Sequence, residues 1–75
     1  MKLYNNTNDE VEYSISSATS DNCGNIVAGQ TADEPYFDNM QGVTVDFSTD
    51  SGNPFNITIP ESKEGMTVTI GLYFE

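Results

Sequence analysis

The stretch that decides the fold is VTVDFSTDSGNPFNITI, residues 43–59. Apolar and polar residues alternate in its first part, VTVDF (43–47), and again in its last part, FNITI (55–59). Such alternation is typical of a half-buried β-strand, because successive side chains of a strand point to opposite faces. The residues between the two runs, STDSGNP (48–54), are turn formers. The stretch therefore predicts a hairpin whose strands each have one apolar and one polar face.

The tripeptide Asp50-Ser51-Gly52 in this turn raises a catalytic alternative, because it resembles the tripeptide at the catalytic carboxylate of aspartic proteases. Those enzymes need two carboxylates that share one proton, and a second copy of the tripeptide could come only from a homodimer. Gly, Asp and Asn favour turns, and Pro54 interrupts the hydrogen bonding of a strand. We therefore interpret the segment as a hairpin turn.

The same two-residue alternation recurs in EVEYSIS (10–16) and in MTVTIGLYF (66–74). Two shorter strands are predicted at KLYN (2–5) and NIVA (25–28). Together with the hairpin, these runs make about six strands whose apolar faces must be buried against one another.

The fold predicted from these runs is all-β, with a single domain over residues 1–75. A small antiparallel β-sandwich is the first choice, and a partly open barrel is the alternative. Short connections join the last three runs, so we expect them to form a C-terminal meander. The segment TADEPYFDNMQG (31–42) shows no alternation and is predicted to be an irregular loop across one end of the sandwich.

The chain is strongly acidic, with 12 Asp+Glu, 2 Lys+Arg and a formal net charge of −10. Lys2 and Lys63 are its only cationic side chains. A field of this sign repels nucleic acid and anionic membranes, and it attracts cations and basic partners. Direct binding to nucleic acid or to a membrane is therefore not expected. The expected partner is a basic protein surface.

The compartment is inferred from cysteine usage and from the first residues of the chain. Cys23 is the single cysteine, so no intrachain disulfide can form, whereas small secreted domains usually depend on disulfides. The opening MKLYNNTNDE (1–10) has no apolar signal region. These features predict a cytoplasmic protein.

Few groups in the sequence are suited to catalysis. Histidine and arginine are absent, so the usual base at neutral pH and the usual ligand for anionic groups are both missing. Cys23 has no histidine partner, and the neighbouring Asp21 disfavours its thiolate. Glycoside hydrolysis needs only two carboxylates, but a domain this small can hardly enclose a sugar. We therefore predict a binding protein with no enzymatic activity and no cofactor.

Three kinds of binding function remain open. The first is an interaction module that engages a basic protein surface, as an acidic mimic of nucleic acid or an inhibitor. The second is a calcium- or carbohydrate-binding sandwich that uses its Asp- and Asn-rich loops, although none of them has the spacing of a helix–loop–helix calcium site. The third is a structural component that docks through an edge strand. The chain is expected to be a monomer or a weak homodimer.

The predicted partner-binding residues are carboxylates and aromatic side chains. Glu10, Glu12 and Asp46 lie on the polar faces of predicted strands and could line one side of the sandwich. Tyr36 and Phe37 follow a proline outside any regular run, and aromatic residues often anchor interfaces. As the alternative, Phe37 plugs the open end of the sandwich and Tyr36 lies across it. The full set is Glu10, Glu12, Asp33, Glu34, Tyr36, Phe37, Asp38, Asp46 and Tyr73.

Overall fold

The structure is a computed structural model of the chain, and it describes residues 1–50, 52 and 54–72. The strands in these residues are β1 (Lys2–Tyr4), β2 (Val11–Ser16), β3 (Asp21–Ile26), β4 (Thr31–Asp33), β5 (Gln41–Ser48), β6 (Phe55–Glu61) and β7 (Thr67–Thr69). Two short 3₁₀ helices complete the fold, η1 (Pro35–Phe37) and η2 (Ile70–Leu72).

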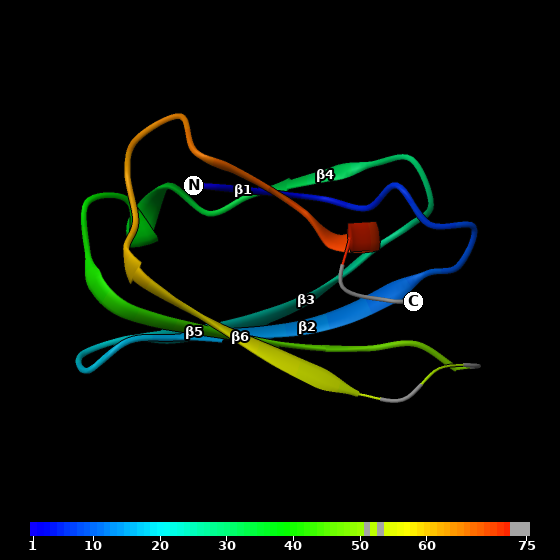
Figure 1. The fold of residues 1–75 in the computed structure, drawn as a ribbon, viewed down its shortest axis with the longest axis horizontal. Coiled ribbons are helices and arrows are strands. Elements are labelled where there is room, and N and C mark those ends of the chain that lie inside the picture. Colours follow the sequence, from blue (N-terminus) through cyan, green and yellow to red (C-terminus); the bar gives the residue numbers. More distant parts are fainter. Residues whose placement is uncertain (51, 53, 73–75) are drawn as a thin grey trace.

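The strands form two sheets that lie one above the other (Figure 1). The larger sheet has four strands in the order β3-β2-β5-β6, and all its neighbours are antiparallel. The smaller sheet has three strands in the order β4-β1-β7, in which β1 pairs antiparallel with β4 and parallel with β7. The two sheets do not close into a barrel, so the predicted all-β sandwich is confirmed.

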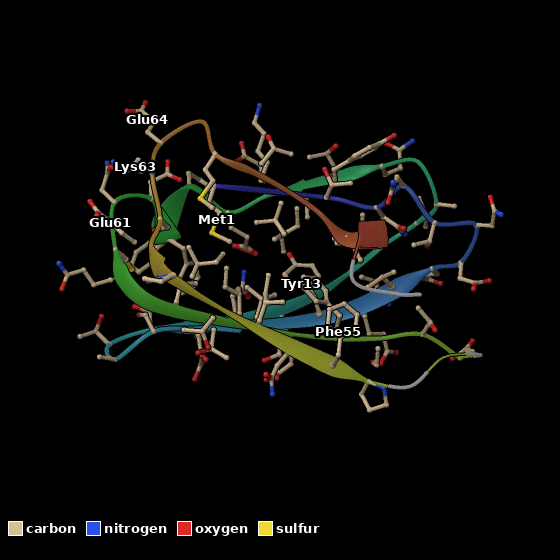
Figure 2. The ribbon with its side chains drawn as sticks, viewed as in Figure 1. Met1, Tyr13, Phe55, Glu61, Lys63 and Glu64 are labelled. Carbon is tan, nitrogen blue, oxygen red and sulfur yellow. The ribbon has the colours of Figure 1, made fainter. Side chains whose placement is uncertain are left out.

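The core fills the space between the two sheets. The apolar positions of the alternating runs point into it, because a two-residue period places every second side chain on one face. The register sets Tyr13 opposite Phe47 and Ile15 opposite Val45. Figure 2 shows Met1 and Tyr13 between the layers. The buried apolar residues are Met1, Leu3, Val11, Tyr13, Ile15, Ile26, Phe37, Val43, Val45, Phe47, Ile59, Val68 and Ile70.

The predicted hairpin is confirmed, but the predicted C-terminal meander is wrong. β5 and β6 pair antiparallel from Gln41–Glu61 to Phe47–Phe55, with Asp50 exposed in the connection that follows β5. The next strand, β7, instead joins β1 in the opposite sheet. The chain changes layer between Ser62 and Met66, where Gly65 has a φ of 77°. That positive φ suits glycine and allows the sharp turn.

The last alternating run is also shorter as a strand than predicted. Only Thr67–Thr69 forms a strand, and the chain then turns into η2 at Ile70. Val68 and Ile70 are nevertheless buried, as the alternation predicted. The end of the predicted run, residues 73–74, lies outside the described residues. Alternation identified the buried side chains here, but it did not determine where the strand ends or which strand it pairs with.

Two further strands differ from the prediction. β3 covers Asp21–Ile26, earlier than the predicted NIVA run, and β4 lies in the segment predicted to be irregular. The inward positions of β3 are not regularly apolar, because Gly24 lies opposite Tyr13. A Cβ placed on Gly24 would lie 3.2 Å from the Tyr13 ring. The tyrosine therefore covers the position that an apolar side chain of β3 would otherwise fill.

Buried polar side chains connect elements that are distant in the sequence. Asn5 is 0% exposed, and its Nδ2 donates to the carbonyl of Ile26 at 2.7 Å and to that of Asp9 at 2.8 Å. Ser62 is also buried; its Oγ accepts from the Met40 amide at 3.0 Å and donates to the Phe37 carbonyl. Asn5 follows β1 and Ile26 ends β3, so this amide links the two sheets.

Candidate interaction surface

The solvent side of the four-stranded sheet is polar apart from Cys23 and Pro60. Three of its outward positions carry exposed carboxylates, those of Glu12, Asp21 and Asp46. Asp46 lies opposite Ser14, and Asp21 lies opposite Ser16. The remaining outward positions are Ser14, Ser16, Cys23, Asn25, Gly42, Thr44, Ser48, Asn56, Thr58 and Pro60.

The register sets the spacing of these carboxylates. Outward positions on a strand repeat every two residues, which is about 6.7 Å. Positions are counted along β2, starting from Glu12. Asp46 on β5 is level with Ser14, one repeat from Glu12, and Asp21 on β3 is level with Ser16, two repeats from Glu12. The three carboxylates are therefore offset along the sheet and lie on three different strands, with Asp46 and Asp21 on either side of β2.

Two more carboxylates extend this row at one end. Glu10 directly precedes β2, and Asp50 follows β5. Both line a cavity of about 140 Å³, together with Glu12 and the hydroxyl-bearing Ser48 and Thr49. We call Glu10, Glu12, Asp21, Asp46 and Asp50 the acidic face.

The chain supplies no positive side chain to the acidic face. Lys2 lies in β1 of the three-stranded sheet, and Lys63 lies in the connection between β6 and β7. The Lys63 Nζ is 3.9 Å from Glu61 Oε1, and Figure 2 shows both side chains at one end of the molecule, with Glu64 nearby. No lysine side chain therefore lies on the acidic face.

The structure brings together Glu10, Glu12 and Asp46, but it places the other predicted acids elsewhere. Asp33 lies on β4 opposite Lys2, on the three-stranded sheet. Asp38 is half-buried and its Oδ1 contacts the amino group of Met1. Tyr73 lies outside the described residues.

The 31–42 segment corrects two expectations about surface residues. Phe37 is 1% exposed, so it fills the end of the core, as the plug alternative predicted, and cannot serve as a surface anchor. Glu34 was expected at the surface but is only 5% exposed. Tyr36 is 69% exposed and is the accessible aromatic residue of this segment. The short turn of η1 separates these side chains, because it directs Phe37 inward and Tyr36 outward.

Glu34 forms the centre of a buried hydrogen-bond network. Its Oε1 accepts from the Tyr13 hydroxyl at 2.8 Å and from Asn22 Nδ2 at 2.9 Å, and the same amide is 3.2 Å from Oε2. Burial raises the pKa of Tyr13 from 10.0 to about 12, and the hydrogen bond to Glu34 and its charge add to the shift. The network thus favours a protonated tyrosine that donates to the carboxylate.

A cavity of about 420 Å³ lies beside this network, between the start of β3 and η1. We call it the η1 cavity. Its lining residues are Ser20, Asp21, Asn22, Glu34, Tyr36 and Phe37. Asp21 lines this cavity and also belongs to the acidic face, so the cavity borders that face. The sequence did not predict this cavity, because it depends on the pairing of β3 with β2 and on the turn of η1.

Within 1–50, 52 and 54–72, no three or more His, Cys, Asp or Glu side chains are grouped so that they could hold a metal ion. In the same part of the chain, no helix has the length and apolar character needed to cross a membrane.

Comparison of the chain with protein-family models, with curated proteins and with solved structures finds no match. Function is therefore inferred from the geometry and charge of the acidic face and of the η1 cavity.

Proposed function

We propose that this chain is a non-catalytic interaction module that binds a basic protein surface through its acidic face. One observation carries the proposal. The outward side of the four-stranded sheet bears Glu12, Asp21 and Asp46, while both lysines of the chain lie outside this sheet. A partner that supplies Lys or Arg side chains would therefore meet carboxylates that no cation of the chain neutralises.

The shape of the acidic face supports a partner that normally binds nucleic acid. Its carboxylates are offset along a sheet whose other outward side chains, apart from Cys23 and Pro60, are small and polar. A nucleic acid also presents many negative charges on one surface, which basic proteins bind with Lys and Arg. We propose that the chain competes with nucleic acid for such a surface. Electrostatic complementarity of this kind accelerates association and weakens as salt is added.

Two double variants that remove the same charge from different surfaces test whether a basic partner binds to the acidic face. The probe is a fluorescent oligoarginine peptide, and its affinity is measured by anisotropy over a range of NaCl concentrations. The E12Q/D46N variant removes two carboxylates of the acidic face, and D33N/E64Q removes the same charge elsewhere by the same kinds of substitution. We expect E12Q/D46N to weaken binding roughly tenfold at low salt and the control to weaken it less than about threefold. Equal losses would show that net charge alone attracts the peptide, and would contradict the proposal.

A displacement experiment tests mimicry of nucleic acid. A fluorescent DNA duplex is bound to a basic DNA-binding protein, such as a linker histone, and the chain is added. We expect the wild-type chain and D33N/E64Q to release the duplex at lower concentrations than E12Q/D46N does. If the duplex stays bound, or if all three chains release it equally, competition through the acidic face is contradicted.

A further inference from the structure

The η1 cavity combines buried and exposed residues that differ in chemistry. Glu34 and Phe37 are almost fully buried, whereas Asp21, Asn22 and Tyr36 are exposed. The cavity volume of about 420 Å³ lies toward the lower end of the range for ligand pockets. It is large enough for a single side chain of a partner, and its lining includes both aromatic and acidic residues.

Glu34 is an unusual group to find inside such a small domain. Buried carboxylates are usually paired with cations, because removing a charge from water is costly. The hydrogen-bond donors to its carboxylate are the neutral Tyr13 hydroxyl and Asn22 amide. Among the described residues, the ion pairs join Met1 to Asp38 and Lys63 to Glu61, so no cation of the chain pairs with Glu34.

Tyr36 provides a second feature that suits a cation. It is 69% exposed, yet its ring packs edge-on against the buried Phe37, with centroids 6.1 Å apart and planes at 68°. This contact supports the ring beside the cavity, while most of its surface stays in water. A cation above the face of an aromatic ring is attracted by its quadrupole.

We propose that the η1 cavity receives one arginine side chain of the basic partner, between the carboxylate of Glu34 and the ring of Tyr36. Arginine fits better than lysine, because a planar guanidinium can bond a carboxylate and also stack on an aromatic ring. Asp21 adds negative charge beside the cavity and is shared with the acidic face. The inference rests on the proposed function, since that face would bring the partner to the cavity.

The first experiment titrates capped tripeptides into the isotope-labelled full chain and follows the amide resonances. The probe is acetyl-Gly-Arg-Gly-amide. Its neutral isostere contains citrulline in place of arginine, and a third peptide contains lysine. We expect saturable shifts for Asn22, Glu34 and Tyr36 with the arginine peptide and none with citrulline. The lysine peptide should bind roughly fivefold more weakly. Equal shifts with citrulline and arginine, or arginine-induced shifts spread evenly over all acidic residues, would overturn the proposal.

The second experiment uses variants that preserve the fold. Glu34→Gln keeps an oxygen that can accept from Tyr13 and Asn22 but removes the charge. Tyr36→Ala removes the exposed ring, and Tyr36→Phe is its matched control. We expect Glu34→Gln and Tyr36→Ala each to weaken the arginine peptide roughly fivefold, and Tyr36→Phe to leave the affinity unchanged. Circular dichroism checks that each variant is folded.

The outcomes separate this inference from the proposed function. Unchanged peptide affinity in folded Glu34→Gln and Tyr36→Ala overturns the arginine site, even if E12Q/D46N still weakens oligoarginine and thereby supports the acidic face. Conversely, equal effects of E12Q/D46N and D33N/E64Q on oligoarginine would contradict the acidic face. Selective losses in the cavity variants would still support the arginine site.

Discussion

The four-stranded and three-stranded sheets bury the same core, but they are built from different kinds of contact. The strands of the four-stranded sheet have six to eight residues, and each strand of the three-stranded sheet has three. Two of the three pairings in the larger sheet join consecutive strands, β2 with β3 and β5 with β6. In the smaller sheet, Leu3 lies between Ala32 and Val68, which are far from it in the sequence. The smaller sheet therefore depends on long-range contacts, whose loop-closure cost is larger than that of local hairpins.

The solvent sides of the two sheets differ in charge as well. The larger sheet carries the acidic face without a lysine, whereas the smaller sheet sets Lys2 beside Asp33. This difference is the reason why the proposed binding is placed on the larger sheet, where the strands carry carboxylates and no lysine.

The largest losses of stability are expected when one buried apolar side chain of each sheet is replaced by alanine. Phe47→Ala should lower the free energy of unfolding by about 4 kcal/mol and Leu3→Ala by about 3 kcal/mol. Both losses are large for a chain whose total stability is expected to be about 4–11 kcal/mol. Urea denaturation measures both. A loss below about 1 kcal/mol for Leu3→Ala would show that the smaller sheet contributes little to stability and does not unfold cooperatively with the core.

A smaller loss is expected from the amide that links the sheets. Asn5→Ala removes the donor to the carbonyls of Ile26 and Asp9. It should lower the free energy of unfolding by about 2 kcal/mol, because buried groups lose their partners. The control is Asn8→Ala at an exposed position, for which the change should stay within about 0.5 kcal/mol. Similar losses for the two variants would mean that Asn5 does not hold the sheets together.

The raised pKa of Tyr13 predicts how the stability of the fold changes at alkaline pH. Its pKa rises from 10.0 to about 12 on folding, so folding favours the protonated phenol. This contribution is complete below pH 10 and is lost as the pH rises toward about 12. Tyr13→Phe should therefore cost about 1 kcal/mol at neutral pH and should show a weaker decline of stability between pH 10 and 12. Parallel stability curves for the two proteins in this range would contradict the raised pKa.

The smallest effect is expected from salt. A net charge of −10 produces self-repulsion, which added salt screens. The melting temperature should rise by about 3–5 °C from low to moderate NaCl concentration. At low salt, E12Q/D46N should raise it more than D33N/E64Q does, because Asp33 lies opposite Lys2. A melting temperature that does not depend on salt would show that repulsion is not a significant cost.

The parts of the fold that the sequence predicted are those governed by local pattern. Alternation identified the inward residues of β2, β5 and β6, and turn chemistry identified the hairpin after Ser48. The parallel pairing of β7 with β1 was missed, because a two-residue period does not specify the partner of a strand. β3 was misplaced because the ring of Tyr13 covers Gly24, so the apolar signal lay on another strand.

For the candidate site, too, the sequence predicted only the residues whose placement follows from local pattern. Glu10, Glu12 and Asp46 could be grouped from the sequence, because their positions relative to the apolar face of each strand were visible. Glu34 and Asp21 could not be placed beside Tyr36, since that arrangement requires the register of β3 and the turn of η1. Burial of Glu34 is equally invisible in the sequence, because a carboxylate in an irregular segment normally lies in water.

The central claim is that the chain binds basic partners through the solvent side of one sheet. The most direct measurement is a map of amide shifts in the full chain when the oligoarginine peptide binds at moderate salt. The account predicts that the largest shifts follow β2, β3 and β5, at Glu12, Asp21 and Asp46 and at their neighbours. Lys2–Tyr4 and Thr31–Asp33 should be nearly unaffected. Shifts of equal size on both sheets, or centred on the three-stranded sheet, would contradict it.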